Sequence, residues 1–131
     1  KSDHAQAEVV QARERLKSLQ ASRARMQTLY DDYVRKCREA EQTAQSISVS
    51  QSYRSFIQQL QSLIVRVDVD IQGAEHLLAQ KRAVLLAAEK KKLQMETLME
   101  KDLQRVRAHQ KRREQLEMDA TGVMLYNFKN S

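Results

Sequence analysis

The sequence contains no proline and only two glycines, Gly73 and Gly122, among its 131 residues. Proline and glycine are the residues that most strongly interrupt helices, so almost the whole chain is free to be helical. With glycines at only two distant positions, no glycine-rich loop can form. This excludes nucleotide hydrolysis by means of a phosphate-binding loop.

Cysteine and aromatic residues are also scarce. Cys37 is the single cysteine, so neither a disulfide within the chain nor a cluster of thiolate metal ligands is possible. Tryptophan is absent and aromatic residues make up 5% of the chain, fewer than a compact core normally uses. The longest unbroken apolar run, Ala83–Ala88, is far shorter than the roughly 18 residues that span a bilayer. We therefore expect an elongated protein without direct membrane insertion.

The excess of positive charge is confined to one segment. The chain has 23 basic and 17 acidic residues, a net charge of +6, and Lys90–Arg113 alone contains nine basic and three acidic residues. This segment could be a solvated helix face, the binding site of an acidic protein, or a nucleic-acid or membrane-surface site. It contains no aromatic residue on which a base could stack, so we expect no nucleic-acid partner.

The first third of the chain carries a heptad pattern. Its seam residues recur at alternating steps of four and three, and the mean step of 3.5 is typical of a left-handed coiled coil. The pattern predicts a helix over about residues 2–43. The seam series is Ala5, Val9, Ala12, Leu16, Leu19, Arg23, Met26, Tyr30, Tyr33, Cys37, Ala40 and Ala44.

A serine-rich stretch at about residues 44–52 interrupts this pattern and predicts a turn, because serine hydroxyls compete for local backbone groups. Ser50 or Ser52 could cap the helix that follows. A second apolar pattern begins at Tyr53, so a second helix is predicted over about residues 51–121, followed by a flexible tail to residue 131. Gly122 could end this helix, or the helix could persist as far as Tyr126. The predicted fold is all-α, a single domain over residues 1–131 that forms a long two-helix antiparallel coiled-coil hairpin with unequal arms.

Folding the chain about this turn pairs residues whose numbers sum to about 96. Arg23 then lies near Gly73, where we expect Asp70 to be its partner and to fix the register. The same register places Tyr33 opposite Leu63. Some thirty residues of the second helix are left without a partner in this chain, and they still carry apolar side chains. These are Met95, Leu98, Met99, Leu103 and Val106. The partner of this segment could be an N-terminal extension of the first helix, a second copy of the chain or another protein.

No catalytic or metal-binding motif is visible in the sequence. The three histidines, at positions 4, 76 and 109, lack the spacing of metal ligands. Cys37 falls on the apolar seam, which favours a packed thiol over a nucleophile with a nearby base. We expect no enzyme activity, no metal and no cofactor.

Four of the six aromatic residues gather around the predicted turn. A two-helix coiled coil cannot bury so many large side chains at one end, and an exposed apolar patch often marks a docking site. The alternative is that these side chains only hold the turn end together. The four residues are Tyr30, Tyr33, Tyr53 and Phe56.

Four segments resemble the FliJ family. Tyr53–Leu60 is similar to the start of that family's second helix, and Leu29–Tyr33 to the matching part of its first helix. Leu93–Lys101 and the arginine-rich Arg112–Asp119 also fit. Two positions depart from the family pattern: Leu116 stands where the family usually has lysine, and Ala120 stands where a glutamate usually follows the aspartate. The resemblance covers most of the chain.

The resemblance implies a non-enzymatic cytoplasmic component of type III secretion, peripherally associated with the inner-membrane export apparatus. FliJ-like proteins, and the related YscO-like proteins of injectisomes, form an antiparallel coiled coil similar to the stalk of rotary ATPases. The expected partners are the ring of the export ATPase at the end that carries the termini, the membrane export gate at the turn end, and export chaperones. The alternative is a generic structural coiled-coil scaffold or oligomerisation module.

The resemblance also implies two sets of contact residues. The residues that match the family's gate-docking patch by position, here called the gate set, are Met26, Leu29, Tyr33, Phe56, Leu60, Leu63 and Val67. The residues expected at the ATPase ring, here called the ring set, are Arg105, Arg107, Lys111, Arg112, Arg113 and Gln115.

Overall fold

The protein consists of two long helices in the computed structural model, which describes residues 2–43 and 47–130. Helix α1 spans Ser2–Gln42 and helix α2 spans Ile47–Asn130, and no strand occurs in these ranges. Contacts divide the chain into two units, Lys1–Ala88 and Glu89–Ser131, which are described separately. The predicted all-α hairpin is confirmed, whereas the single domain stays a prediction.

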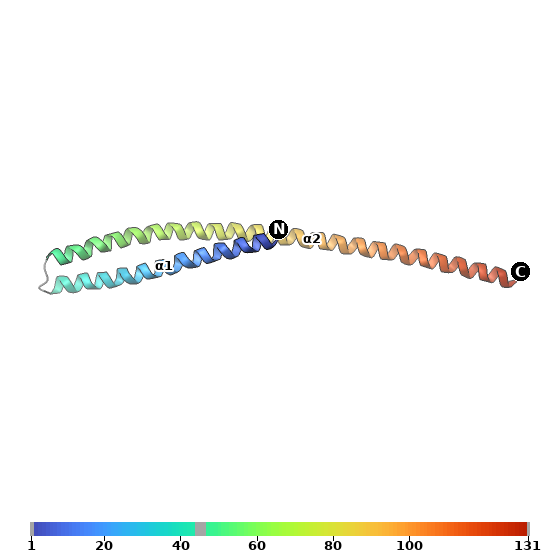
Figure 1. The fold of residues 1–131 in the computed structure, drawn as a ribbon, viewed down its shortest axis with the longest axis horizontal. Coiled ribbons are helices and arrows are strands. Elements are labelled where there is room, and N and C mark those ends of the chain that lie inside the picture. The colour runs from blue at the N-terminus through green and yellow to red at the C-terminus, as the bar shows by residue number, and fades with distance from the viewer. Residues whose placement is uncertain (1, 44–46, 131) are drawn as a thin grey trace. The chain divides into compact units, whose positions relative to one another are not determined.

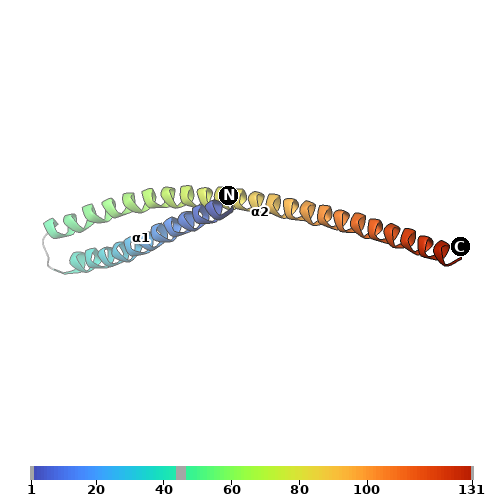
Figure 2. The same ribbon diagram turned by 45° about the vertical axis from the view of Figure 1, so that its right-hand side comes forward.

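In the first unit, α1 runs alongside the first part of α2 in the opposite direction, as Figures 1 and 2 both show. We call this pair of helices, α1 with residues 47–88 of α2, the hairpin. Its seam is narrow, because no large side chain among the described residues is fully buried. The buried seam residues keep the predicted heptad spacing, and they are Ala5, Val9, Ala12, Cys37 and Ala40 on α1 and Leu60, Ile64, Val67, Ala74 and Leu78 on α2.

Polar contacts across the seam establish the register. Glu8 accepts a hydrogen bond from Lys81 at 3.1 Å, and Arg23 donates one to Asp68 at 2.6 Å. The paired numbers therefore sum to 89 and 91, so the predicted sum of about 96 is wrong. The cause is the connection between the helices, because α1 ends at residue 42 and α2 already begins at residue 47.

The corrected register changes the partners of several seam residues. Asp70 is not the partner of Arg23, which pairs with Asp68 instead. Tyr33 packs against the ring of Phe56 at a centroid distance of 4.5 Å, so the predicted pairing with Leu63 is also wrong. The type of contact that we expected at Arg23, an ion pair with a carboxylate across the seam, is confirmed.

The predicted turn is too long, because residues 47–52 belong to α2. The serines there bond in ways that the helix tolerates: the Ser52 hydroxyl donates to the Ser48 carbonyl at 3.0 Å, and the Ser50 hydroxyl donates to Glu41 at 3.5 Å. Helix caps at Ser50 and Ser52 are therefore wrong. Residues 44–46, the rest of the predicted turn, lie outside the described residues.

Helix α2 also continues past its predicted end, because residues 122–130 are helical. A glycine usually ends a helix by adopting a positive φ angle, and neither glycine does so here. Gly122 therefore stays inside α2, and the flexible tail predicted for these residues is wrong. Ser131 lies outside the described residues.

Two carboxylates at the seam have a lowered pKa. The hydrogen bond from Lys81, together with its charge, lowers the pKa of Glu8 below its ordinary value of 4.5. The hydrogen bond and charge of Arg54 lower the pKa of Glu41 in the same way, and Glu41 raises the pKa of Arg54 in return. Because both carboxylates bind protons more weakly in the folded state, they stabilise the hairpin in their charged form.

We expect Leu78→Ala to lower the free energy of unfolding of the hairpin by about 2–4 kcal/mol, because it opens a cavity in the seam. Leu78 is 5% exposed and packs with Val9 and Ala12. Leu86→Ala is the matched control, since Leu86 is 68% exposed, and its effect should stay within about 0.5 kcal/mol. Urea unfolding followed by circular dichroism measures both, and equal effects would contradict the assigned seam.

We expect the melting temperature of the hairpin to fall as the pH drops below about 4.5, because protonation of Glu8 and Glu41 removes their ion pairs. The double variant Glu8→Gln with Glu41→Gln should lose part of this acid dependence. Thermal melts between about pH 3 and pH 7 measure it. Glu14→Gln with Glu75→Gln is the control, because the structure describes no ion pair of these two side chains, and an identical change there would rule out the assignment.

Candidate functional site

Three aromatic side chains pack together near the connection between the helices, and we call them the aromatic cluster. The Tyr33 ring of α1 contacts two rings of α2, Tyr53 edge-on at 5.8 Å and Phe56 at 4.5 Å between centroids. The Lys36 ammonium lies 5.0 Å from the Tyr33 ring centroid. All three rings are half-buried, so they both hold this end of the hairpin together and present apolar surface to solvent.

Tyr30, which we expected in the same cluster, has another contact. Its hydroxyl accepts a hydrogen bond from the Gln61 side chain at 3.1 Å across the seam. The heptad explains this difference, since Tyr30 lies about one turn of α1 before Tyr33 and so opposite a later part of α2. Tyr30 thus contributes to register, while Tyr33, Tyr53 and Phe56 form the apolar surface.

The gate set does not form one exposed surface. Leu29 and Leu63 are 39% and 46% exposed, and Met26 is half-buried, as are Tyr33 and Phe56 of the aromatic cluster. The two remaining members lie in the seam: Leu60 is 4% and Val67 9% exposed. Docking by the gate set stays a prediction, and in the hairpin only its five more exposed members are open to a partner.

The hairpin exposes further apolar residues that the sequence analysis did not single out. Val65 and Val69 are 63% and 62% exposed, and Leu77 is 43% exposed. Within the heptad, Leu77 lies beside the seam, whereas Val65 and Val69 lie on the side of α2 that faces away from the seam. This spacing is visible in the sequence, but which apolar row faces α1 depends on the register.

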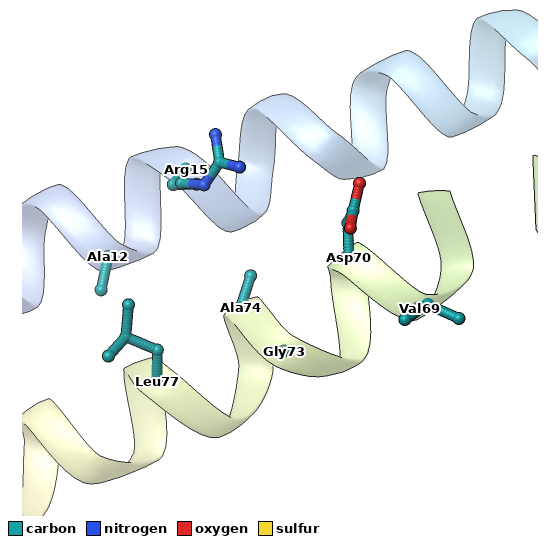
Figure 3. Close-up of a pocket in the computed structure, with 7 residues that line it drawn as sticks. All are labelled: Ala12, Arg15, Val69, Asp70, Gly73, Ala74 and Leu77. Atoms are coloured by element: carbon teal, nitrogen blue, oxygen red, sulfur yellow. The ribbon is translucent and has the colours of Figure 1, made fainter. Parts of the chain in front are cut away.

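An open groove runs between α1 and α2 at the level of Gly73 (Figure 3). Ala12, Gly73 and Ala74 leave it shallow because their side chains are small or absent. Arg15 of α1 and Asp70 of α2 line its edges, and the structure describes no ion pair for either side chain. A groove this open does not exclude water from a substrate, so it is unlike an active site.

The ring set lies on the second unit, where every described residue is exposed. Arg105 forms a weak ion pair with Asp102 at 3.7 Å, and Gln115 donates to Asp119 at 3.4 Å. Helical spacing puts Arg105 and Arg112 on one face and Arg107 and Lys111 on another. The six residues therefore surround the helix more than they share a face, and their role stays a prediction.

Cys37 is buried in the seam as predicted. Its thiol lies 3.8 Å from the Glu41 carboxylate and 4.0 Å from the Ser50 carbonyl. Residues 2–43 and 47–130 contain no group of three or more histidine, cysteine or acidic side chains that could hold a metal ion. Within the same ranges, neither helix has a stretch apolar enough to cross a membrane.

The whole chain, residues 1–131, matches the family described as FliJ, flagellar FliJ protein. The chain belongs to the FliJ family. The resemblance drawn from the four sequence segments is thereby confirmed, and the family implies a role in flagellar protein export, in association with the export apparatus. The family is a structural component of export and is not known as an enzyme. No curated protein and no solved structure matches the chain.

We expect Gly73→Ala to raise the free energy of unfolding of the hairpin by roughly 1 kcal/mol, because alanine favours a helix more than glycine does. Apart from the adjoining backbone of its own helix, a Cβ at position 73 would meet no atom within 4 Å, so the groove can hold it. Urea unfolding measures the change. Gly122→Ala is the control, because Gly122 lies in the second unit and its substitution should not alter unfolding of the hairpin. If Gly73→Ala instead destabilises the hairpin, the groove requires a residue without a side chain at position 73.

Proposed function

We propose that the protein is a non-enzymatic stalk and adaptor of the flagellar type III export apparatus. In this role it links the export ATPase ring to the membrane export gate and to the chaperones that deliver export substrates. It would act in the cytoplasm, peripherally associated with the inner-membrane apparatus. Membership of the FliJ family supports the general role in export.

The observation that carries the proposal is the chemical difference between the two units. The first unit presents a half-buried aromatic cluster with exposed leucines beside it. The second unit presents an exposed helix with a basic excess between Lys90 and Arg113. Two surfaces of such different chemistry suit two different partners, as an adaptor requires.

At the gate, contact would come from the exposed and half-buried members of the gate set. Tyr33 and Phe56 are suited to it, since aromatic side chains contribute much of the binding energy in protein interfaces. Leu29 and Leu63 would extend the apolar surface. Leu60 and Val67 would act from the seam, where they hold the two helices in the register that places the other five.

At the ATPase ring, contact would come from long basic side chains. The ring set is fully exposed, and most of its cations have no ion pair within the described part of the chain. Exposed charges of one sign speed association and make it sensitive to salt. A ring that surrounds the helix would also use basic residues on more than one face, as this set provides.

One observation favours the alternative, a generic coiled-coil scaffold. The second unit exposes an apolar row that includes Met95, Met99 and Val106. Such a row can join copies of the same chain. Light scattering separates the two functions, because a stable dimer or tetramer at micromolar concentration supports the scaffold and a monomer supports the adaptor.

We expect reversal of charge at Arg105, Arg112 and Arg113, each changed to glutamate, to weaken binding to the export ATPase at least about tenfold, because it removes cations from the ring contact. Titration calorimetry at two salt concentrations measures this. The matched control changes Arg13, Lys17 and Arg25, which are exposed on α1, to glutamate. If both triple variants bind the ATPase like the unaltered protein, the ring set is wrong.

The same titration with the cytoplasmic part of the export gate tests the other partner. Leu29→Asp with Leu63→Asp should weaken this binding and leave ATPase binding unchanged, because both side chains are exposed members of the gate set. Val65→Asp is the control, as Val65 is 63% exposed and lies outside the set. A gate that binds all these variants equally well would contradict the proposed docking surface.

A further inference from the structure

The heptad of the hairpin seam continues along α2 beyond the residues that α1 covers. Leu85 and Ala88 are the last seam positions that are partly buried. The same alternation of three and four residues then runs over exposed side chains from residue 92 to residue 130. Apolar residues in this continuing seam are 55–68% exposed, and they are Met95, Met99, Val106, Leu116 and Val123. Such a row is typical of a helix that packs against a second helix.

The hairpin shows how two antiparallel helices of this chain align. In a heptad written a to g, the seam positions are a and d. Ala12 at d packs with Leu78 at a, and Glu8, the neighbour of Val9 at a, binds Lys81 at d. An a residue of one helix therefore lies opposite a d residue of the other. The same rule limits the registers in which the continuing seam can pair.

We propose that residues 92–130 of α2 pair antiparallel with the same residues of a second copy, in the register that places Lys92 of one copy opposite Asn130 of the other. The two copies are then related by a two-fold axis, so each contact occurs twice. The proposal goes beyond the adaptor function, because it depends on neither the ATPase nor the gate.

The hairpin itself selects this register. One more heptad of overlap would place Asn127 and Asn130 of the second copy opposite Ala88 and Leu85, on the side of α2 that α1 already covers. One heptad less would leave Met95 without a partner. The proposed register is therefore the longest overlap that begins beyond α1.

In this register, large apolar seam residues lie opposite one another. Met99 lies opposite Val123 of the second copy, and Val106 lies opposite Leu116. All four side chains are more than half exposed in a single copy. Pairing therefore removes apolar surface from water in four layers around the two-fold axis.

The charges beside the seam also fit the antiparallel pair. Arg105 of one copy lies beside Asp119 of the other. Within the chain these two side chains have only long contacts, Arg105 with Asp102 at 3.7 Å and Asp119 with Gln115 at 3.4 Å. Arg112 meets its own copy at the two-fold axis, and this like-charge contact weakens the pair.

A parallel pair would have better matched flanks. Lys91 and Arg112 at g would then lie beside Glu96 and Glu117 at e of the second copy. Exposed ion pairs of this kind contribute little to stability, because water and salt screen them. The choice between the two arrangements therefore depends on the seam.

The seam favours the antiparallel pair. In a parallel pair, Lys92, Asp102 and Arg113 would each meet the identical residue of the second copy, and like charges cost more where the seam removes water from them. In the antiparallel pair, Asp102 instead lies opposite Ala120. A parallel pair would also bring α2 of the second copy to Ala88 on the side that α1 covers.

Polar layers make the pair weak and reversible. Lys92 lies opposite Asn130, and His109 opposite Arg113, so only part of the seam is apolar. We expect a dissociation constant on the order of 0.1 mM. At micromolar concentrations the protein is then a monomer, and this face is open to the partners of the adaptor function. The pair covers the face only where copies are concentrated.

Sedimentation equilibrium of the full chain between about 10 µM and about 1 mM tests for the pair. We expect a monomer at the low end and a dimer at the high end. Met99→Asp should weaken the dimer at least about tenfold, because it places a charge opposite Val123. Met118→Asp is the matched control, since Met118 is 69% exposed and lies off the seam. Circular dichroism checks that both variants keep their helix content.

Charge variants separate the two arrangements by the sign of their effect. Arg112→Gln should tighten an antiparallel dimer about threefold, because it removes the like-charge contact at the axis, but it would weaken a parallel dimer by removing the partner of Glu117. Asp119→Asn should weaken the antiparallel dimer, because Arg105 loses its partner. The same sedimentation measurement applies to both variants.

Disulfide trapping determines which residues meet. In a chain with Cys37→Ala, Val106→Cys and Leu116→Cys are made as separate variants and mixed under oxidised glutathione. The antiparallel pair predicts a disulfide between the two variants and little of either variant with itself. Ala108→Cys mixed with Glu114→Cys is the matched control, because these positions lie at equal levels of the pair but off the seam.

Three results would overturn the proposal. A monomer over the whole concentration range would show that a second copy does not cover this face. Disulfides of each seam variant with itself, or weakening by Arg112→Gln, would show a parallel pair. Equal trapping in the control mixture, or equal weakening by Met118→Asp, would show contact without a defined seam. None of these results depends on ATPase or gate binding, so failure here is distinct from failure of the adaptor function.

Discussion

The seam between α1 and the first part of α2 is the interaction on which the rest of the hairpin depends. It is built largely from small or medium side chains such as Ala5, Val9 and Ala12, so each layer buries little apolar area and many layers are needed. Because the seam is narrow, most large apolar side chains stay partly exposed. The stabilising contact and the candidate docking surfaces thus share the same residues or their direct neighbours, as at Tyr33 and Phe56.

The heptad pattern was enough to predict two antiparallel helices, but not how they slide past each other. That register depends on where the connection lies, and the serine-rich stretch was a poor guide, since Ser50 and Ser52 bond comfortably within or beside a helix. An error of a few residues there moved the expected partner of Arg23 from Asp68 to Asp70. The end of α2 was also misplaced. A glycine commonly ends a helix by adopting a positive φ angle, and Gly122 does not adopt one.

The exposure of the candidate site residues also depends on the register. Family resemblance supplied the gate set by position, yet exposure depends on the side of α2 that each residue occupies, so Leu60 and Val67 are buried while Leu63 is not. Only the pairing with α1 determines this. The basic residues of the second unit could be predicted as exposed from the sequence, because that segment has charges on every face.

The ion pairs Glu8–Lys81 and Glu41–Arg54 hold different stretches of the hairpin, one near each end of α1. The narrow seam does not couple these two ion pairs to each other. Each layer of the seam therefore depends mainly on the layers next to it, much as in repeat proteins. Separation of the helices can begin at one end and stop before the other. Fraying beside the aromatic cluster would therefore leave the seam around Val9 and Leu78 intact, so the surface at one end of the hairpin can change in sequence without loss of the packing at the other end.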